Sequence, residues 1–297
     1  MRILGIGILI FLAVDVYGQG CSDAGFCTLN SFKPHADSTT FSNMLKVGAN
    51  VGVADHSIGI FGSYLEFNRK ISKKLGADVK LTMLSQSGNN ISAAGLSDVF
   101  VNFNYHAGDH FTFTAGVKMP LADGNKSRNG AALPMDYQSS LGTFDLILGG
   151  GYKFRKLQTL MAYQQPLTQN NNSFLATQYS SDSPLSTFQS TNQFHRKGDL
   201  LVRASYPIQA TRKIAITPSL LPIYHLGNDT YVDEQSVTRK IDGSNGLTLN
   251  ANLYIDFAIG NSYMLQFNFG TPLVVREARP DGLTRSLIVN LEYTVKF

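Results

Sequence analysis

The sequence predicts an all-β fold, a closed antiparallel up-and-down transmembrane β-barrel of about twelve strands. Three observations predict it: apolar and polar residues alternate along many segments, the connections between these segments alternate in length, and charged residues make up only 15% of the chain. Successive side chains of a strand point to opposite faces, so this alternation gives each strand one apolar and one polar face. Beyond the N-terminus no run of about eighteen apolar residues occurs, so the sequence offers no helical membrane span.

The N-terminus has the composition of a secretory signal peptide. Arg2 precedes an apolar run over 3–14, which is too short to cross a bilayer, and small residues follow near Gly18. We therefore assign residues 1–18 to a signal peptide, with a buried N-terminal helix as the alternative. Residues 19–40 form an N-terminal periplasmic or plug segment, and residues 41–297 form the barrel.

The only two cysteines, Cys21 and Cys27, stand directly after the predicted signal peptide. An oxidising envelope favours a local disulfide between them, and a reduced tail is the alternative. Two cysteines without a nearby histidine do not make a metal site, so we predict no metal and no cofactor. Residues 19–40 contain no predicted strand; they either fold back into the barrel as a plug or remain a periplasmic tail.

Twelve segments carry the strand pattern. The clearest is 247–257, where six apolar residues at odd positions alternate with Thr248, Asn250, Asn252, Tyr254 and Asp256. The others are 43–53, 58–70, 75–84, 98–106, 111–119, 142–154, 157–165, 200–208, 214–225, 263–275 and 285–297. Fourteen strands is the alternative if 166–197 hides a further hairpin.

The connections sort by length. Short ones at 69–74, 107–109, 154–156, 209–213 and 260–262 alternate with longer ones at 85–94, 121–140, 166–197, 227–246 and 276–284, and only the connection at 55–57 is brief among the latter set. A barrel with both termini in the periplasm has short periplasmic turns and longer outer loops. A soluble β-sandwich has no reason to sort its loops in this way.

The last segment, 285–297, alternates without glycine or proline and ends on an aromatic residue. It resembles the final strand of a bacterial outer-membrane barrel. This resemblance implies an outer-membrane location and outer-membrane lipid around the barrel. It also implies that Tyr293, Val295 and Phe297 form the assembly signal read by the barrel-assembly machinery.

With the apolar face toward lipid, the polar face lines the lumen. We expect this face to carry acids and bases in similar number, whose charges either pair to hold the wall or form a selectivity ring along a permeation path. The predicted lumen-facing residues are Lys46, Glu66, Asp78, Lys80, Asp98, Lys118, Asp145, Lys153, Arg203, Asp256 and Glu292. Pro218 and Pro222 in one strand mark either a lateral gap in the wall or an ordinary bulge.

Three further pieces carry a family resemblance: 94–99 (Ala-Gly-Leu-Ser-Asp-Val), 118–124 (Lys-Met-Pro-Leu-Ala-Asp-Gly) and 134–149, which contains Gln138 and Leu-Gly-Thr-Phe-Asp at 141–145. Together they resemble the outer-membrane transporter family associated with phenol-degradation pathways. More distantly, the chain is similar to the fatty-acid and toluene transporters, whose lumen is plugged. The resemblance implies uptake of small hydrophobic compounds.

The predicted function is a passive or plug-gated outer-membrane transporter for small, hydrophobic solutes. A structural or adhesive barrel without transport is the alternative, and an outer-membrane hydrolase comes third. We predict no enzyme, because the adjacent His56 and Ser57 would face opposite sides of a strand and no orienting group accompanies them. The net charge of +4 is too small for this length to indicate a nucleic-acid partner.

Overall fold

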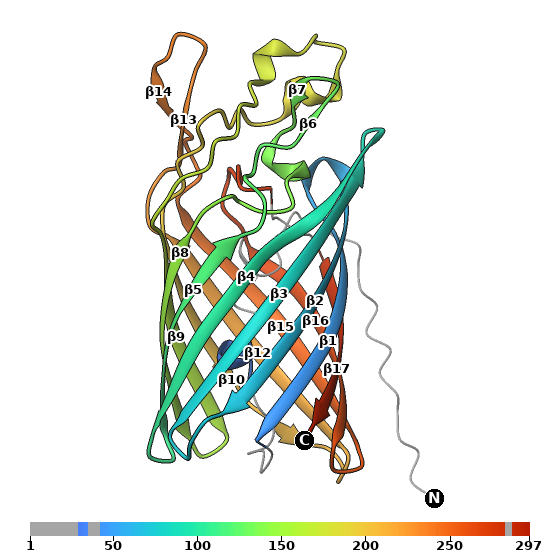
Figure 1. The fold of residues 1–297 in the computed structure, drawn as a ribbon, viewed down its shortest axis with the longest axis vertical. Helices are drawn as coiled ribbons and strands as arrows, with labels where there is room; N and C mark the ends of the chain where they lie inside the picture. Colours follow the sequence, from blue (N-terminus) through green and yellow to red (C-terminus); the bar gives the residue numbers. More distant parts are fainter. Residues whose placement is uncertain (1–28, 35–41, 283–286) are drawn as a thin grey trace, which may run out of the picture.

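The computed structural model describes residues 29–34, 42–282 and 287–297, most of which form one antiparallel barrel (Figure 1). Each barrel strand pairs with its neighbours in the sequence, and β1 closes the ring against β17. The barrel strands are β1 (Asn43–Val53), β2 (Gly59–Lys70), β3 (Leu75–Gly88), β4 (Ile91–Ala107), β5 (Phe111–Pro120), β8 (Asp145–Phe154), β9 (Leu157–Pro166), β10 (Asp199–Ser205), β12 (Ile214–His225), β15 (Gly246–Ile259), β16 (Tyr263–Val274) and β17 (Leu287–Lys296). The short β11 (Ile208–Gln209) continues β10 along the same side of β12.

The predicted closed barrel of twelve strands is thereby confirmed. The fourteen-strand alternative is wrong, since the fully described interval 166–197 contains no further barrel strand. Among the described residues, no helix combines the length and apolar character that crossing a bilayer requires.

The two faces of the wall have the polarity opposite to that of a soluble protein. Val47 and Phe61 are 53% and 51% exposed on the outside, whereas Lys46 and Glu66 are 4% and 0% exposed on the inside. The ladders place Lys46 opposite Glu66 and Glu66 opposite Lys80, so unlike charges face each other across neighbouring strands. An apolar outer surface around a polar interior is stable when lipid covers the outside.

The predicted long connection at 85–94 is wrong. β3 and β4 continue through it and meet at a two-residue turn, Asn89–Asn90, in which both residues have positive φ (50° and 59°). Asparagine tolerates this left-handed backbone, which suits a tight hairpin. At residues 85–94 the two strands extend beyond the membrane. Lipid does not contact their outer face there, so the sequence lacks the alternation of apolar and polar residues.

The first and last strands of the barrel begin and end side by side, at the end of the barrel that carries the short turns. The Asn43 backbone N–H donates to the Phe297 carbonyl oxygen at 2.9 Å, and the Phe297 N–H donates back to Asn43 at 3.0 Å. Aromatic rings gather near this end, as in the pair of Phe111 and Tyr152, whose ring centroids are 4.8 Å apart. Aromatic side chains favour the boundary between hydrocarbon and water, so this end lies at one membrane surface.

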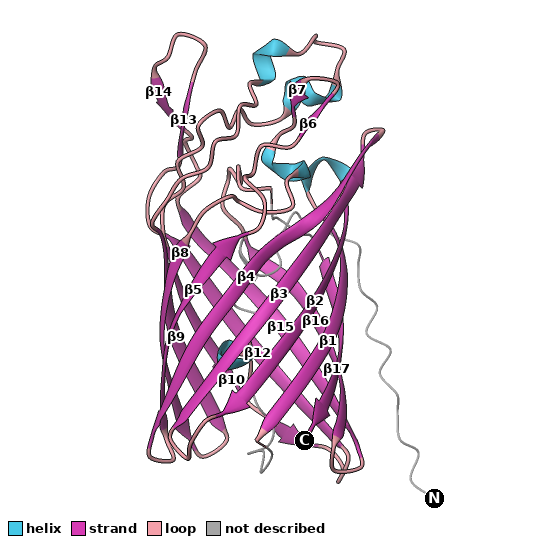
Figure 2. Cartoon of the chain, in the orientation of Figure 1, coloured by secondary structure: helices cyan, strands magenta, loops and turns pink. Residues whose placement is uncertain are grey.

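The loops at the opposite end form a folded cap (Figure 2). Its elements are η3 (Asp55–Ser57), β6 (Ser127–Arg128), β7 (Ala131–Ala132), η4 (Met135–Tyr137), η5 (Ala176–Gln178), η6 (Pro184–Thr187), β13 (Thr230–Val232) and β14 (Thr238–Lys240). One apolar cluster joins Phe174, Leu185 and Phe188 of the loops to Ile60 and Leu84 of the wall. The outer mouth is therefore covered by packed loops.

Pro218 and Pro222 of β12 cause neither a lateral gap in the wall nor a bulge, the two consequences predicted from the sequence. β12 pairs with β15 in one continuous register past Pro218 and Pro222. Toward β10 and β11 the register is also constant, and the missing pairs are those opposite each proline and its neighbour: Leu221 and Pro222, and Thr217 and Pro218. Proline has no N–H to donate, which accounts for this local loss without a bulge or a gap.

The candidate channel lumen

The first described segment, residues 29–34, lies inside the barrel, where Figure 2 shows its short 3-10 helix η2 enclosed by strands. The Asn30 backbone N–H donates to Glu66 Oε1 at 3.1 Å, and Ser31 Oγ donates to Asp78 Oδ1 at 2.8 Å. These acceptors belong to the inner faces of β2 and β3. The segment thus occupies the bore, and we call residues 29–34 the plug.

Lys33 carries the charged anchor of the plug. Its Nζ donates to Glu292 Oε2 at 2.5 Å, and the same carboxylate oxygen accepts the Tyr64 hydroxyl at 2.6 Å. Lys46 Nζ lies 3.3 Å from the other Glu292 oxygen and donates to the Asn30 side chain at 2.7 Å. All three charged groups are buried, so each depends on the others for the interactions that water would otherwise supply.

The other side of the plug is apolar. Leu29 and Phe32 are fully buried against inward-facing side chains of β4, β8, β9, β10 and β12, which we call the apolar strip: Phe100, Ile147, Ala162, Leu201, Leu221 and Ile223. Gly149 makes room for the Phe32 ring, since a Cβ there would lie 2.5 Å from Phe32 Cε1. Arg203 donates from Nη1 to the Phe32 carbonyl oxygen. The plug therefore rests on charge at one wall and on hydrocarbon at the other.

A second layer fills the bore toward the outer end. The connection from β5 to β8 folds inward, and Ser140 Oγ donates to Asp98 Oδ1 of β4 at 2.7 Å. Lys118 Nζ of β5 lies 3.0 Å from Asp145 Oδ2 and donates to Thr143 Oγ1 at 3.0 Å. Charge pairing and hydroxyl donors thus fasten this inward-folded loop to the wall.

Gln138 and Gly142 shape that loop. The Gln138 side chain accepts from the Lys126 N–H at 2.6 Å and donates to the Leu133 carbonyl at 2.9 Å, while Gln86 donates to the Gln138 carbonyl at 2.6 Å. Gly142 has φ +68°, and a Cβ there would lie 2.3 Å from the Asp123 carbonyl oxygen. Glycine is therefore required at this position by both backbone conformation and space.

A cavity of about 530 Å³ lies between the plug and the short-turn mouth. Its inner end is formed by the plug from Asn30 to Pro34, and its sides come from all around the barrel, including Met44, Leu160 and Met264. We call this cavity the periplasmic vestibule, because the short turns of such a barrel are predicted to face the periplasm. It is large enough for a small organic solute.

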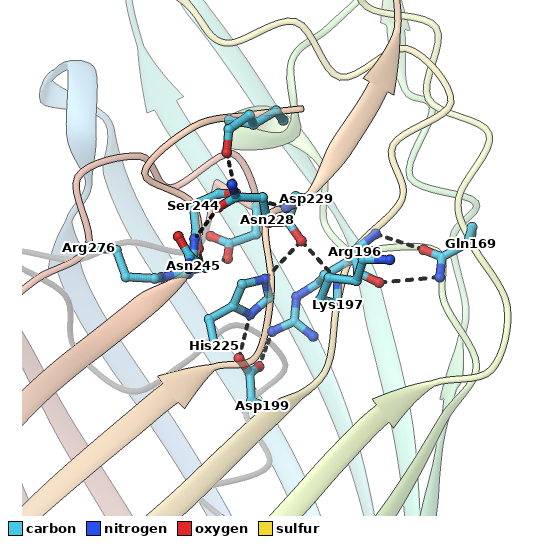
Figure 3. A network of polar contacts seen from close by, with 12 residues as sticks. Gln169, Arg196, Lys197, Asp199, His225, Asn228, Asp229, Ser244, Asn245 and Arg276 are labelled. Carbon is cyan, nitrogen blue, oxygen red and sulfur yellow. Dashed lines mark hydrogen bonds and ion pairs between the residues drawn. The ribbon is translucent and has the colours of Figure 1, made fainter. Parts of the chain in front are cut away.

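A polar network fixes the outer ends of β10 and β12 to the loops above them (Figure 3). His225 Nδ1 lies 2.7 Å from Asp199 Oδ1, and His225 Nε2 lies 2.8 Å from Asp229 Oδ1. Carboxylate oxygens only accept, so both ring nitrogens donate and the ring is an imidazolium. Arg196 pairs with the second Asp199 oxygen, and Lys197 donates its N–H to Asp229 at 2.9 Å. Two long loops thereby share one buried ionic anchor.

The structure places ten of the eleven predicted lumen residues in buried positions within the barrel, and it exposes Lys153 at the short-turn mouth. The ten are Lys46, Glu66, Asp78, Lys80, Asp98, Lys118, Asp145, Arg203, Asp256 and Glu292. Of the predicted assembly signal, Tyr293 and Phe297 point outward, 40% and 59% exposed. Their role in assembly stays a prediction, and the predicted disulfide between Cys21 and Cys27 lies outside the described residues.

Sequence reasoning missed the plug anchors Asn30, Ser31 and Lys33, and it missed Tyr64. It also missed the ionic anchor around His225. The described residues contain no group of three or more His, Cys, Asp and Glu arranged to hold a metal ion. His56, the histidine weighed for a hydrolase, stacks its ring on Phe188 with centroids 3.9 Å apart.

No protein-family model and no curated protein matches the sequence. Among solved structures, the chain is similar to an outer-membrane channel from Pseudomonas putida F1, with a TM-score of 0.59 and 12% identity over 88% of this chain and 97% of that one. It also aligns with the CymD monoaromatic hydrocarbon channel (TM-score 0.47, 8% identity, 92% and 93% covered) and with a FadL homologue from Pseudomonas aeruginosa (0.46, 10%, 95% and 100%). The first likeness establishes the fold: this chain has the β-barrel fold of an outer-membrane channel.

Proposed function

We propose that this protein is an outer-membrane channel for small hydrophobic solutes, closed at rest by the plug. The observation that carries the proposal is the apolar strip on the inside of the barrel. A bore that serves hydrated solutes is lined with polar groups. Here Ile147, Leu201, Leu221 and Ile223 turn apolar surface inward, and the plug covers that surface with its own Leu29 and Phe32.

The plug supplies the gate. When it leaves, the surface that Leu29 and Phe32 covered becomes available to a solute of similar size and polarity. Burying a side chain of this kind is worth about 2 kcal/mol, so a hydrophobic solute can replace much of what the plug loses. The resemblance of 94–149 to transporters of phenol-degradation pathways supports the same solute class.

The test is the uptake rate of radiolabelled toluene by cells whose outer membrane carries the protein. We expect Leu221→Asn to slow uptake, because it puts a polar amide in the apolar strip. Thr217→Asn is the matched control, since Thr217 is buried on the same face of β12 but lies outside the strip. Uptake equal to that of cells lacking the protein, or equal rates for wild type and Leu221→Asn, would contradict the proposal.

One observation favours the alternative of a structural or adhesive barrel. The outer loops pack into a cap with its own apolar clusters, as around Phe174 and Phe194, and such an ordered surface suits protein recognition. A barrel of that kind would show no flux for any solute. The toluene measurement with the wild-type protein therefore separates the two functions.

A further inference from the structure

The periplasmic vestibule is lined unevenly by charge. Among the described residues, ten Lys and Arg residues and three Asp residues line it. Lys33 and Lys46 pair with Glu292, and without these two lysines the lining residues still carry an excess of five positive charges. This excess is larger than the net charge of +4 of the whole chain, so the remaining residues together are net negative. Positive charge is therefore concentrated at one end of the barrel.

Two of the three acids in this cavity, Asp78 and Asp256, are already engaged, and the third, Asp109, is exposed in the turn between β4 and β5. Asp78 accepts hydrogen bonds from Ser31, Asn102 and Asn104 at 2.6–2.8 Å. Asp256 accepts from Gln266 at 2.7 Å. These carboxylates are satisfied by neutral donors of the wall and the plug, so they are not aimed at the cations of the vestibule.

A second group of charged residues, the mouth cations, lies near the opening of the vestibule. Within residues 29–34, 42–282 and 287–297, none of the mouth cations forms an ion pair; they are Arg69, Lys70, Lys73, Lys153, Arg212 and Lys213, with Lys296 slightly deeper. They come from the end of β2 and the turn after it, the end of β8, the turn before β12 and the end of β17, so they surround the opening. A cleft lined by one sign of charge with low-dielectric walls focuses the field and concentrates counter-ions.

We infer that the periplasmic vestibule is a binding site for small organic anions. A solute with one carboxylate would place that group among the mouth cations, and its apolar part would meet Leu160 and Met264 farther in. Lysine and arginine donate charge-assisted hydrogen bonds to carboxylates, which are stronger than those to neutral acceptors. The inference extends the proposed function to acidic solutes, but the anion site rests on the charges of the vestibule and not on the apolar strip.

The probes are benzoate and benzamide, which have nearly the same size and differ in charge. Binding is measured by NMR on the purified full-length protein in a neutral detergent. We expect benzoate to bind more tightly than benzamide, and its affinity to fall as salt is added. Equal affinities for the two probes, or a benzoate affinity that is independent of salt, would overturn the inference.

The variant Lys73→Glu/Lys153→Glu tests the location of the site. Its matched control is Lys74→Glu/Lys156→Glu, which changes the net charge equally at nearby residues that do not line the vestibule, in the turn between β2 and β3 and in the turn after β8. Taking a separation of about 8 Å, one screening length at 0.15 M salt, between each reversed charge and the anion, we expect benzoate affinity to fall about fourfold at 0.15 M salt and about fifteenfold at 0.01 M. Equal losses in both variants would overturn the inference.

Toluene uptake separates this inference from the proposed function. If the vestibule variant loses benzoate binding but takes up toluene at the wild-type rate, both stand. If benzoate binding shows the expected charge dependence while no toluene uptake is seen, the anion site stands and the hydrophobic channel falls. If toluene enters but benzoate does not bind, the anion site falls.

Discussion

The plug anchor gives the sharpest prediction. Replacing Glu292 by glutamine keeps the shape of the side chain but removes the charge that Lys33 and Lys46 share. With the plug in place, Lys33 would then be buried beside a neutral amide. When the plug leaves, Lys33 returns to water. The substitution therefore destabilises the closed arrangement and leaves the open one less affected.

The size of the effect follows from the burial of the pair. Both side chains are at most 3% exposed, and removing one partner of a buried ion pair costs about 3 kcal/mol or more. Since about 1.4 kcal/mol corresponds to a tenfold change in an equilibrium constant, Glu292→Gln is expected to raise the fraction of released plug about a hundredfold.

The chain offers a clean assay because it contains no tryptophan. Phe32→Trp places one indole in the apolar seat of the plug, where acrylamide cannot reach it, and release of the plug exposes it to the quencher. In this background we expect Glu292→Gln to increase quenching and shift the emission to longer wavelength. Lys33→Met/Glu292→Gln is the control: it removes both charges, so quenching should return toward that of the parent. Identical quenching of the parent and Glu292→Gln would refute the reasoning.

Three further predictions concern the outer end. Gly142→Ala should destabilise the inward-folded loop by about 2 kcal/mol, from positive φ and the clash with the Asp123 carbonyl, and should lower the melting temperature followed by near-ultraviolet circular dichroism; an unchanged melt would count against the close contact. His225→Gln leaves its two carboxylate partners without a shared cation, so trypsin should cut the loops sooner than in the wild type; equal cleavage rates would contradict the ionic anchor. Burial raises the pKa of Asp136 in η4 to about 7, so the folded loop holds a proton that the unfolded chain releases near pH 4. The stability of the loop therefore falls as pH rises between about 4 and 7. Asp136→Asn should remove this pH dependence of stability, and a slope that persists in the variant would assign the dependence to another group.

The wall of the barrel could be predicted because its cause is local. Lipid outside and charge inside impose a period of two on each strand, and this period is visible within ten residues of sequence. The predicted strand 200–208 is interrupted at 206–207, where Pro207 separates β10 from β11. The other large errors in the strand bounds lie where the local cause is absent. At 85–94 the strands leave the membrane, and at 142–144 the chain bends inward to bring Thr143 to Lys118 before β8 begins at Asp145.

The plug anchors could not be predicted because they are contacts between distant residues. Lys33 and Glu292 are 259 positions apart, and nothing in either neighbourhood specifies the other. The ionic anchor of His225 likewise joins the ends of two strands, β10 and β12, to the loops beside them. A lysine among apolar residues shortly before the first strand, Lys33 beside Phe32, was the available signal. Such a charge needs a buried counter-charge once its segment enters the bore.

The three segments that carry the family resemblance meet in the inward-folded loop. Asp98 comes from the first, Lys118 from the second, and Ser140 and Asp145 from the third. These residues bind one another and close the outer half of the bore. The resemblance therefore describes how this half of the bore is built. Within the structure, the surfaces that bear on the solute are the apolar strip beside the plug and the cations of the vestibule, because a passing molecule would touch them.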